Sequence, residues 1–151
     1  MREITKKDIK DLAPKRIVER GYGYFEKEYV SNPITFKERL VAEVTGRRNY
    51  KTRVDFIGDE IKTSCTCPYD GLVCKHAIAL LYTWLYKREN FINFERIEEK
   101  LLDKKKIELV ELIEKIISSS PKLARFLFYV EDTIDSKIYK SHINRLLDGY
   151  Y

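Results

Sequence analysis

All three cysteines of this chain lie within ten residues of one another, beside one of its two histidines. Cys65 and Cys67 are separated by one residue, and Cys74 and His76, again separated by one, follow after six more. Three thiolates and one imidazole are donors that zinc accepts in a tetrahedral arrangement. Because four protein donors would fill that arrangement, we expect one structural Zn2+ with no open position for a substrate.

Three alternatives remain open for these residues at this point. The cysteines could be buried apolar side chains, although three of them beside His76 argue against that reading. They could form a redox disulfide, but the spacing differs from the C-x-x-C of thioredoxin-like proteins. One could be a nucleophile with His76 as base, which needs a free thiolate and a third, orienting group. His142 is expected to be a packed or surface residue rather than a ligand.

The segment before the first cysteine predicts a small sheet. Residues 34–65 alternate between two faces, as in a three-stranded antiparallel meander with one solvated side. One face of each strand is indicated separately: Leu40, Ala42 and Val44 in the first, Tyr50, Thr52, Val54 and Phe56 in the second, and Ile61, Thr63 and Cys65 in the third. Turns are predicted at residues 46–49 and 58–60, where glycines interrupt the pattern. The third strand therefore leads directly to Cys65.

The segment after the last cysteine predicts a helix over residues 75–88, with Ile78, Leu81, Tyr82 and Leu85 at helical spacing. Two positions along a helix correspond to a rotation of about 200°. Cys74 and His76 therefore cannot both lie in a regular helix and face one ion. We expect Cys74 just before the first turn and His76 within it.

Helices are also predicted at the N-terminus. Residues 1–30 contain a capping box at Thr5 and Asp8, a division at Pro14, and two glycines, Gly21 and Gly23, that break the helical periodicity. An aromatic cluster lies at the end of this region. Its members, Tyr22, Tyr24, Phe25 and Tyr29, are expected to pack against the sheet rather than stack on bases.

Beyond residue 90 the pattern is entirely helical. Amphipathic helices are predicted around 107–117, 123–130 and 138–147, with Ser120 as the N-cap and Pro121 as the first residue of the middle one. The expected fold is α+β, with a zinc-clamped helix on a three-stranded sheet. We predict a zinc-binding domain with a helical lead-in at 1–90 and a helical extension at 91–151.

The sequence SCTCPYDGLVCKHAIALLY resembles the SWIM-type zinc finger, whose pattern is CxCx6CxH. The upstream stretch GYGYFEKEYV is also similar, and the tail KIELVELIEKIISSSPKLARFL looks like the helical extension of many stand-alone prokaryotic and archaeal members. The resemblance implies that Cys65, Cys67, Cys74 and His76 bind one Zn2+. It also implies a module that binds DNA or protein, since some members partner RecA-type recombinase paralogues in recombination and repair.

Two functional hypotheses follow. The first is an adaptor that binds another protein, with a RecA-family recombinase paralogue in homologous recombination and DNA repair as the expected partner. The second is an autonomous DNA-binding protein that uses Arg47, Arg48, Lys51 and Arg53, four cations within seven residues. A solvated hairpin tip explains the same four cations equally well. An enzyme has little support, because the chain has no P-loop motif and a closed metal site would occupy every thiol.

Composition sets the remaining expectations. A formal net charge of +5 and a pI near 9.0 are compatible with nucleic acid without requiring it. The charged N-terminus lacks the apolar core of a signal peptide, and no run reaches the roughly 18 apolar residues of a membrane helix. An odd number of clustered cysteines suits a reducing compartment. We therefore expect a cytoplasmic protein.

Overall fold

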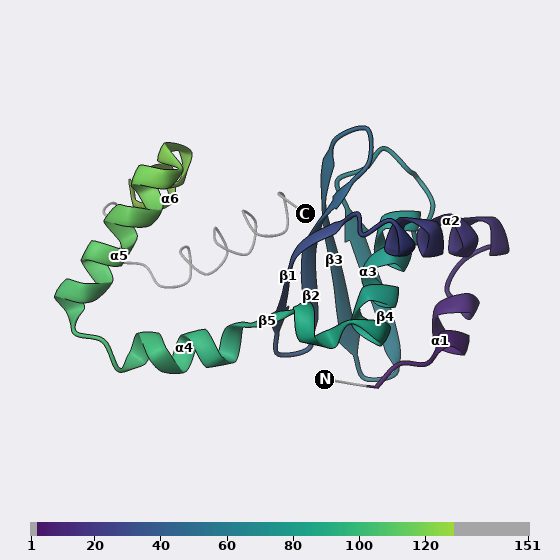
Figure 1. The fold of residues 1–151 in the computed structure, drawn as a ribbon, viewed down its shortest axis with the longest axis horizontal. Helices are drawn as coiled ribbons and strands as arrows, with labels where there is room; N and C mark the ends of the chain where they lie inside the picture. The colour runs from purple at the N-terminus through teal and green to yellow at the C-terminus, as the bar shows by residue number, and fades with distance from the viewer. Residues whose placement is uncertain (1–2, 129–151) are drawn as a thin grey trace. The chain divides into compact units, whose positions relative to one another are not determined.

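The computed structural model describes residues 3–128 (Figure 1). Contacts group these residues into two compact units, which divide between Glu95 and Arg96. The domain boundary expected near residue 90 remains a prediction. Within the described residues, no helix has the length and apolar character needed to cross a membrane.

The first unit contains one sheet with the strand order β4-β3-β2-β1-β5. In the described residues its five strands are β1 (Val30–Phe36), β2 (Arg39–Thr45), β3 (Asn49–Ile57), β4 (Glu60–Cys65) and β5 (Ile92–Asn93). Consecutive strands from β1 to β4 are antiparallel, whereas β5 runs parallel to β1. The predicted α+β class and the meander are confirmed, but the expected number of strands, three, was too low.

The two strands that the sequence did not reveal lack a clear alternation. In β1 the register shifts between Ser31 and Ile34, and Asn32 has a positive φ of 50°. Pro33, which has no N–H to donate, lies inside the same irregularity. β5 is only two residues long, too short to show any periodicity. Its pairing with β1 is a tertiary contact that local sequence does not encode.

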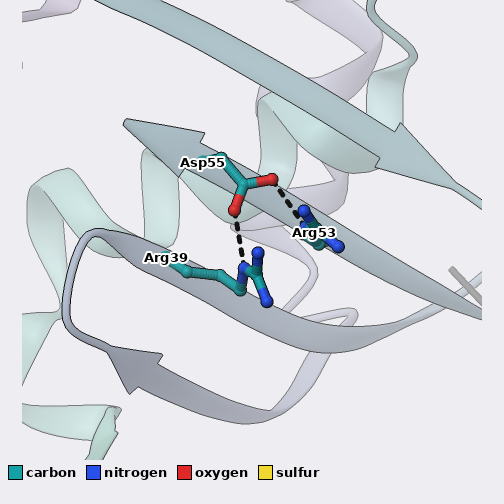
Figure 2. Close-up of polar contacts among 3 residues, drawn as sticks. All are labelled: Arg39, Arg53 and Asp55. Carbon is teal, nitrogen blue, oxygen red and sulfur yellow. Dashed lines mark hydrogen bonds and ion pairs between the residues drawn. The ribbon is translucent and has the colours of Figure 1, made fainter. Parts of the chain in front are cut away.

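One face of the sheet is buried, and the structure shows which face it is. Leu40, Ala42 and Val44 of β2 lie in the core, and in the antiparallel register Leu40 is opposite Val54 and Ala42 is opposite Thr52. On the other face, Asp55 lies between two arginines (Figure 2). Its carboxylate oxygens accept from Arg39 Nε and Arg53 Nε, each at 2.6 Å.

Helix α3 (Lys75–Tyr86) is the centre of this unit, because eight consecutive residues, 76–83, are buried. It contacts β1 to β4 on one side and the N-terminal helices α1 (Lys6–Asp11) and α2 (Lys15–Glu26) on another. An amphipathic helix has one wet face, whereas a helix covered on both sides needs apolar residues all round. This explains the run AIALLY in the sequence.

The N-terminal helices begin as predicted. Thr5 Oγ1 accepts from the Asp8 N–H at 3.2 Å, and the Asp8 carboxylate accepts from the Thr5 N–H at 2.7 Å, so the capping box is formed. Pro14 directly precedes α2. The prediction that Gly21 and Gly23 break the helix was wrong, because α2 continues through both to Glu26.

Gly21 is required where α2 crosses α3. A Cβ at this position would overlap the Ile78 side chain and lie 2.8 Å from the Lys75 carbonyl oxygen. At Gly23, by contrast, a Cβ would meet nothing within 4 Å. Next to these glycines, Tyr22 and Phe25 pack on the ring of Tyr82. These aromatic residues are therefore packing residues, as expected, but they pack on α3 rather than on the sheet.

Between α3 and residue 128, the regular elements are helical except for β5. Its elements are the 3-10 turn η1 (Arg88–Asn90), α4 (Phe94–Leu102), α5 (Lys106–Ser119), the 3-10 turn η2 (Pro121–Ala124) and α6 (Arg125–Phe128). Ser120 and Pro121 start an element as predicted, but it is a 3-10 turn rather than an α-helix. The helix predicted around 138–147 lies outside the described residues.

The two glycines of α2 provide a test of this packing. Gly21→Ala should destabilise the protein by about 1–3 kcal/mol, since an added methyl group in a tight crossing forces side chains or backbone to move. Gly23→Ala is the matched control and should stabilise by about 0.5–1 kcal/mol, because alanine favours helix and the site is open. Urea unfolding would measure both. Equal midpoints for the two variants would contradict the proposed close approach.

Candidate metal centre

The structure brings the four predicted donors together. The three Sγ atoms and one imidazole nitrogen lie within 4.8 Å of one another. His76 Nδ1 is 3.7 Å from Cys65 Sγ and 3.8 Å from Cys74 Sγ. Tetrahedral zinc, with Zn–S near 2.3 Å and Zn–N near 2.0 Å, places its ligand atoms about 3.5–3.8 Å apart. The donor set and its spacing therefore fit one structural Zn2+.

Each donor is positioned by the end of an element. Cys65 is the last residue of β4, Cys67 follows in the loop, and Cys74 is the extended N-cap residue of α3 with φ −91° and ψ 165°. His76 lies in the first turn of that helix. Cys74 therefore precedes the helix, as the rotation argument required. A zinc ion held by these four residues would tie the edge strand β4 to the start of the central helix.

The thiols have unequal proton affinities in the metal-free cluster. A hydrogen bond from Cys74 lowers the pKa of Cys65 to about 4, and His76 and Thr52, whose Oγ1 is 3.3 Å from Cys65 Sγ, act in the same direction. The pKa of Cys74 is raised because its proton is shared with Cys65, and burial raises the pKa of Cys67. Zinc must therefore displace protons from Cys67 and Cys74, so its binding weakens as the pH falls.

Nδ1 of the imidazole faces the thiols, while aromatic rings pack against the rest of the ring. Tyr50 lies against it with ring centroids 4.8 Å apart, and Tyr24 packs edge-on at 5.3 Å. His76 Nε2 is buried and has no hydrogen-bond partner among the described residues, although metal-bound histidines usually donate to a carboxylate or carbonyl. Gly46 permits this packing, because a Cβ there would lie 2.9 Å from Tyr50 Cε2 and 3.4 Å from His76 Nε2.

Sequence reasoning missed this supporting layer. The alternation placed Tyr50 and Thr52 on one face of their strand, but nothing in their spacing indicated contact with the metal ligands. Tyr24 was recognised only as part of an aromatic cluster. A tyrosine in α2 reaches His76 because α2 packs across α3, which is a tertiary arrangement.

The four predicted nucleic-acid-binding cations are not equivalent. Arg47 and Arg48 are exposed in the turn between β2 and β3, and no carboxylate of residues 3–128 pairs with either guanidinium. Arg53 is half-buried on the outer sheet face and bound to Asp55. Lys51 lies directly opposite Glu43 in the strand register. Arg47 and Arg48 at the hairpin tip therefore have no ion pair within residues 3–128, while Lys51 and Arg53 lie beside acidic residues.

Comparison with known proteins agrees with this geometry. Residues 49–85 match the sequence model of the SWIM zinc finger, from β3 to the end of α3, and so include all four donors. This region is a SWIM zinc finger. An uncharacterized protein of Methanocaldococcus jannaschii, MJ1493, is 33% identical over 102 residues, which are 68% of this chain. The chain spans only 42% of that relative's length. No solved structure matches the chain.

The assignment of a zinc finger predicts the zinc content of the protein. Purified protein should contain one zinc per chain by elemental mass spectrometry. Cys67→Ala should lose the metal and expose residues 60–80 to amide hydrogen exchange, because three remaining donors leave the loop unanchored. Asp70→Ala, in the same loop but outside the donor set, should keep both the zinc and the protection. Zinc-free protein that retains full protection in this region would overturn the assignment.

Proposed function

We propose that this protein is a zinc-stabilised adaptor that binds another protein. The SWIM zinc finger is a binding domain rather than a catalytic one. Its metal has four protein donors, so the ion stabilises structure and leaves no coordination site for a substrate. Function then depends on the surfaces that the folded chain presents.

The observation that carries the proposal is an apolar ridge on α5, formed by Ile107, Val110, Ile113 and Ile116. These residues recur every three positions and are all exposed, with Ile107 at 62%. Successive members lie about 60° apart around the helix, so neighbours in the row are in contact and the row runs obliquely across the helix surface rather than along one face. A row of exposed branched side chains is typical of a surface that another protein covers.

The expected partner is a RecA-type recombinase paralogue acting in DNA recombination and repair. This partner rests on the resemblance to SWIM proteins alone, and the M. jannaschii relative adds no information about partners. The three cysteines form no disulfide in the structure, which would suit the reducing, cytoplasmic setting expected for this protein.

Binding to the recombinase paralogue from the same organism provides the test. Ile113→Asp should weaken the complex at least about tenfold, since a charge in a desolvated interface is costly. Ser118→Asp adds the same group at an exposed position of α5 away from the ridge and should have little effect. Isothermal titration calorimetry would measure both. The adaptor proposal fails if no complex forms, or if only the lone protein is recovered from the native extract.

A second candidate function is direct DNA binding by the hairpin tip. Arg47 and Arg48 favour this function, because both are exposed, have no ion pair within residues 3–128 and can contact phosphates. The DNA-binding site would then lie at the predicted hairpin, but Arg53 would contribute less than expected because it is paired with Asp55.

Salt-dependent binding to duplex DNA tests this second function. Affinity at low salt should fall in the range of about 1–100 µM, and replacing both Arg47 and Arg48 with alanine should lower the slope of log K against log salt by about two. Arg53→Ala is the control and should leave the slope nearly unchanged, because Asp55 already holds its guanidinium. Absence of binding up to about 100 µM would exclude the function.

A further inference from the structure

A groove of about 420 Å³ opens directly beside the zinc centre. The metal ligands Cys67, Cys74 and His76 contribute to its lining. The rest comes from α2, the β2–β3 turn, the loop after β4 and the start of α3, and includes Arg20, Tyr24, Arg47, Tyr50, Tyr69 and Lys75. A second hollow of about 600 Å³ shares Arg47 and Tyr50 and adds Arg48, Asn49 and Thr66. The two hollows therefore lie next to each other at the hairpin tip, and their combined lining is called the track.

The track is positively charged. No aspartate or glutamate of the described residues lines either hollow. Arg20, Arg47 and Arg48 have no ion pair within residues 3–128, and Lys75 Nζ lies 4.5 Å from the centre of the Tyr24 ring. Zinc with three thiolates carries one formal negative charge, which these four cations exceed. The surface beside the metal therefore attracts anions.

Aromatic rings alternate with these cations. Tyr50 is shared by both hollows and is fixed by its packing on His76. Tyr69 is 43% exposed, and its ring lies so close to Gly71 that a Cβ there would overlap it. A ring braced from one side is a surface on which a planar ligand can stack. Cations and stacking surfaces therefore lie side by side along the track.

We propose that this track binds single-stranded nucleic acid, with the arginines contacting phosphates and the tyrosines stacking on bases. Non-specific single-strand sites combine a positive groove with aromatic platforms in this way. A duplex keeps its bases stacked inside and would leave the tyrosines unused. Two neighbouring hollows also exceed the needs of one isolated phosphate. The inference rests on the second proposed function, and it assigns Arg20, Tyr69 and Lys75 to a site that the hairpin alone does not include.

Fluorescence anisotropy of a labelled oligo-dT strand with the full, zinc-loaded chain tests the proposal. Arg20→Glu should weaken binding and lower the salt slope by about one. Tyr69→Leu, which keeps an apolar side chain but removes the ring, should weaken binding about tenfold. Lys62→Glu is the matched control, because Lys62 is an exposed cation of β4 outside the track, and it should change affinity less than twofold. The zinc content of each variant identifies any variant that fails to fold. Arg20 lies on α2, outside the metal loop, so Arg20→Glu tests the proposal even if Tyr69→Leu loses its zinc.

Three results would overturn the proposal. The first is a duplex of the same length bound as tightly as the single strand, which would leave direct DNA binding by the hairpin intact. The second is an equal loss of affinity in Lys62→Glu, or no loss of affinity in Tyr69→Leu. Either result would show that binding comes from the overall charge of the protein rather than from the track. The third is competition by polyglutamate as effective as that of unlabelled oligo-dT. If neither strand nor duplex binds, the site and the second proposed function fail together.

Discussion

Coordination of zinc by three thiolates and one imidazole is the interaction on which the edge of this domain depends. Burial holds little of the loop between Cys67 and Cys74, because Asp70 and Gly71 are exposed and Leu72 is 96% exposed. Besides the metal, the contacts that fix it are the packing of Val73 on the core and the hydrogen bond from Thr63 Oγ1 of β4 to the Leu72 carbonyl oxygen. The same ion joins the last residue of an edge strand to the first turn of the central helix. Metal binding and formation of the core are therefore coupled.

The central helix explains why small residues matter so much in this fold. α3 is covered by the sheet on one side and by α1 and α2 on another, so it has almost no solvated surface. Helices that cross closely require a residue without a side chain at the contact, which Gly21 supplies against Ile78. Gly46 plays a comparable part at the metal, where it lets Tyr50 reach His76. In many metal sites a hydrogen bond from the second ring nitrogen orients the histidine. In this site, close packing of the aromatic rings orients the imidazole instead.

The distribution of ion pairs separates two surfaces of the domain. On the outer sheet face, Asp55 binds Arg39 and Arg53, so these cations are partly neutralised (Figure 2). At the hairpin tip and along α2, Arg47, Arg48 and Arg20 have no such partner among the described residues. Unpaired cations keep their full attraction for phosphate, whereas paired ones must first lose a carboxylate. The number of positive charges along the sequence could not distinguish the paired arginines from the unpaired ones.

The sequence by itself determined what depends on neighbouring residues. Spacing within a short stretch of sequence was enough to predict the donor set, the capping box at Thr5, the β2–β4 meander and the apolar helix α3 that ends at Tyr86. Tertiary structure decided what depends on distant contacts. The pairing of β1 with β5, the continuation of α2 through Gly21 and the meeting of Arg20, Arg47 and Tyr69 beside the zinc all join residues far apart in the chain. Their physical cause is packing around α3, which local periodicity does not record.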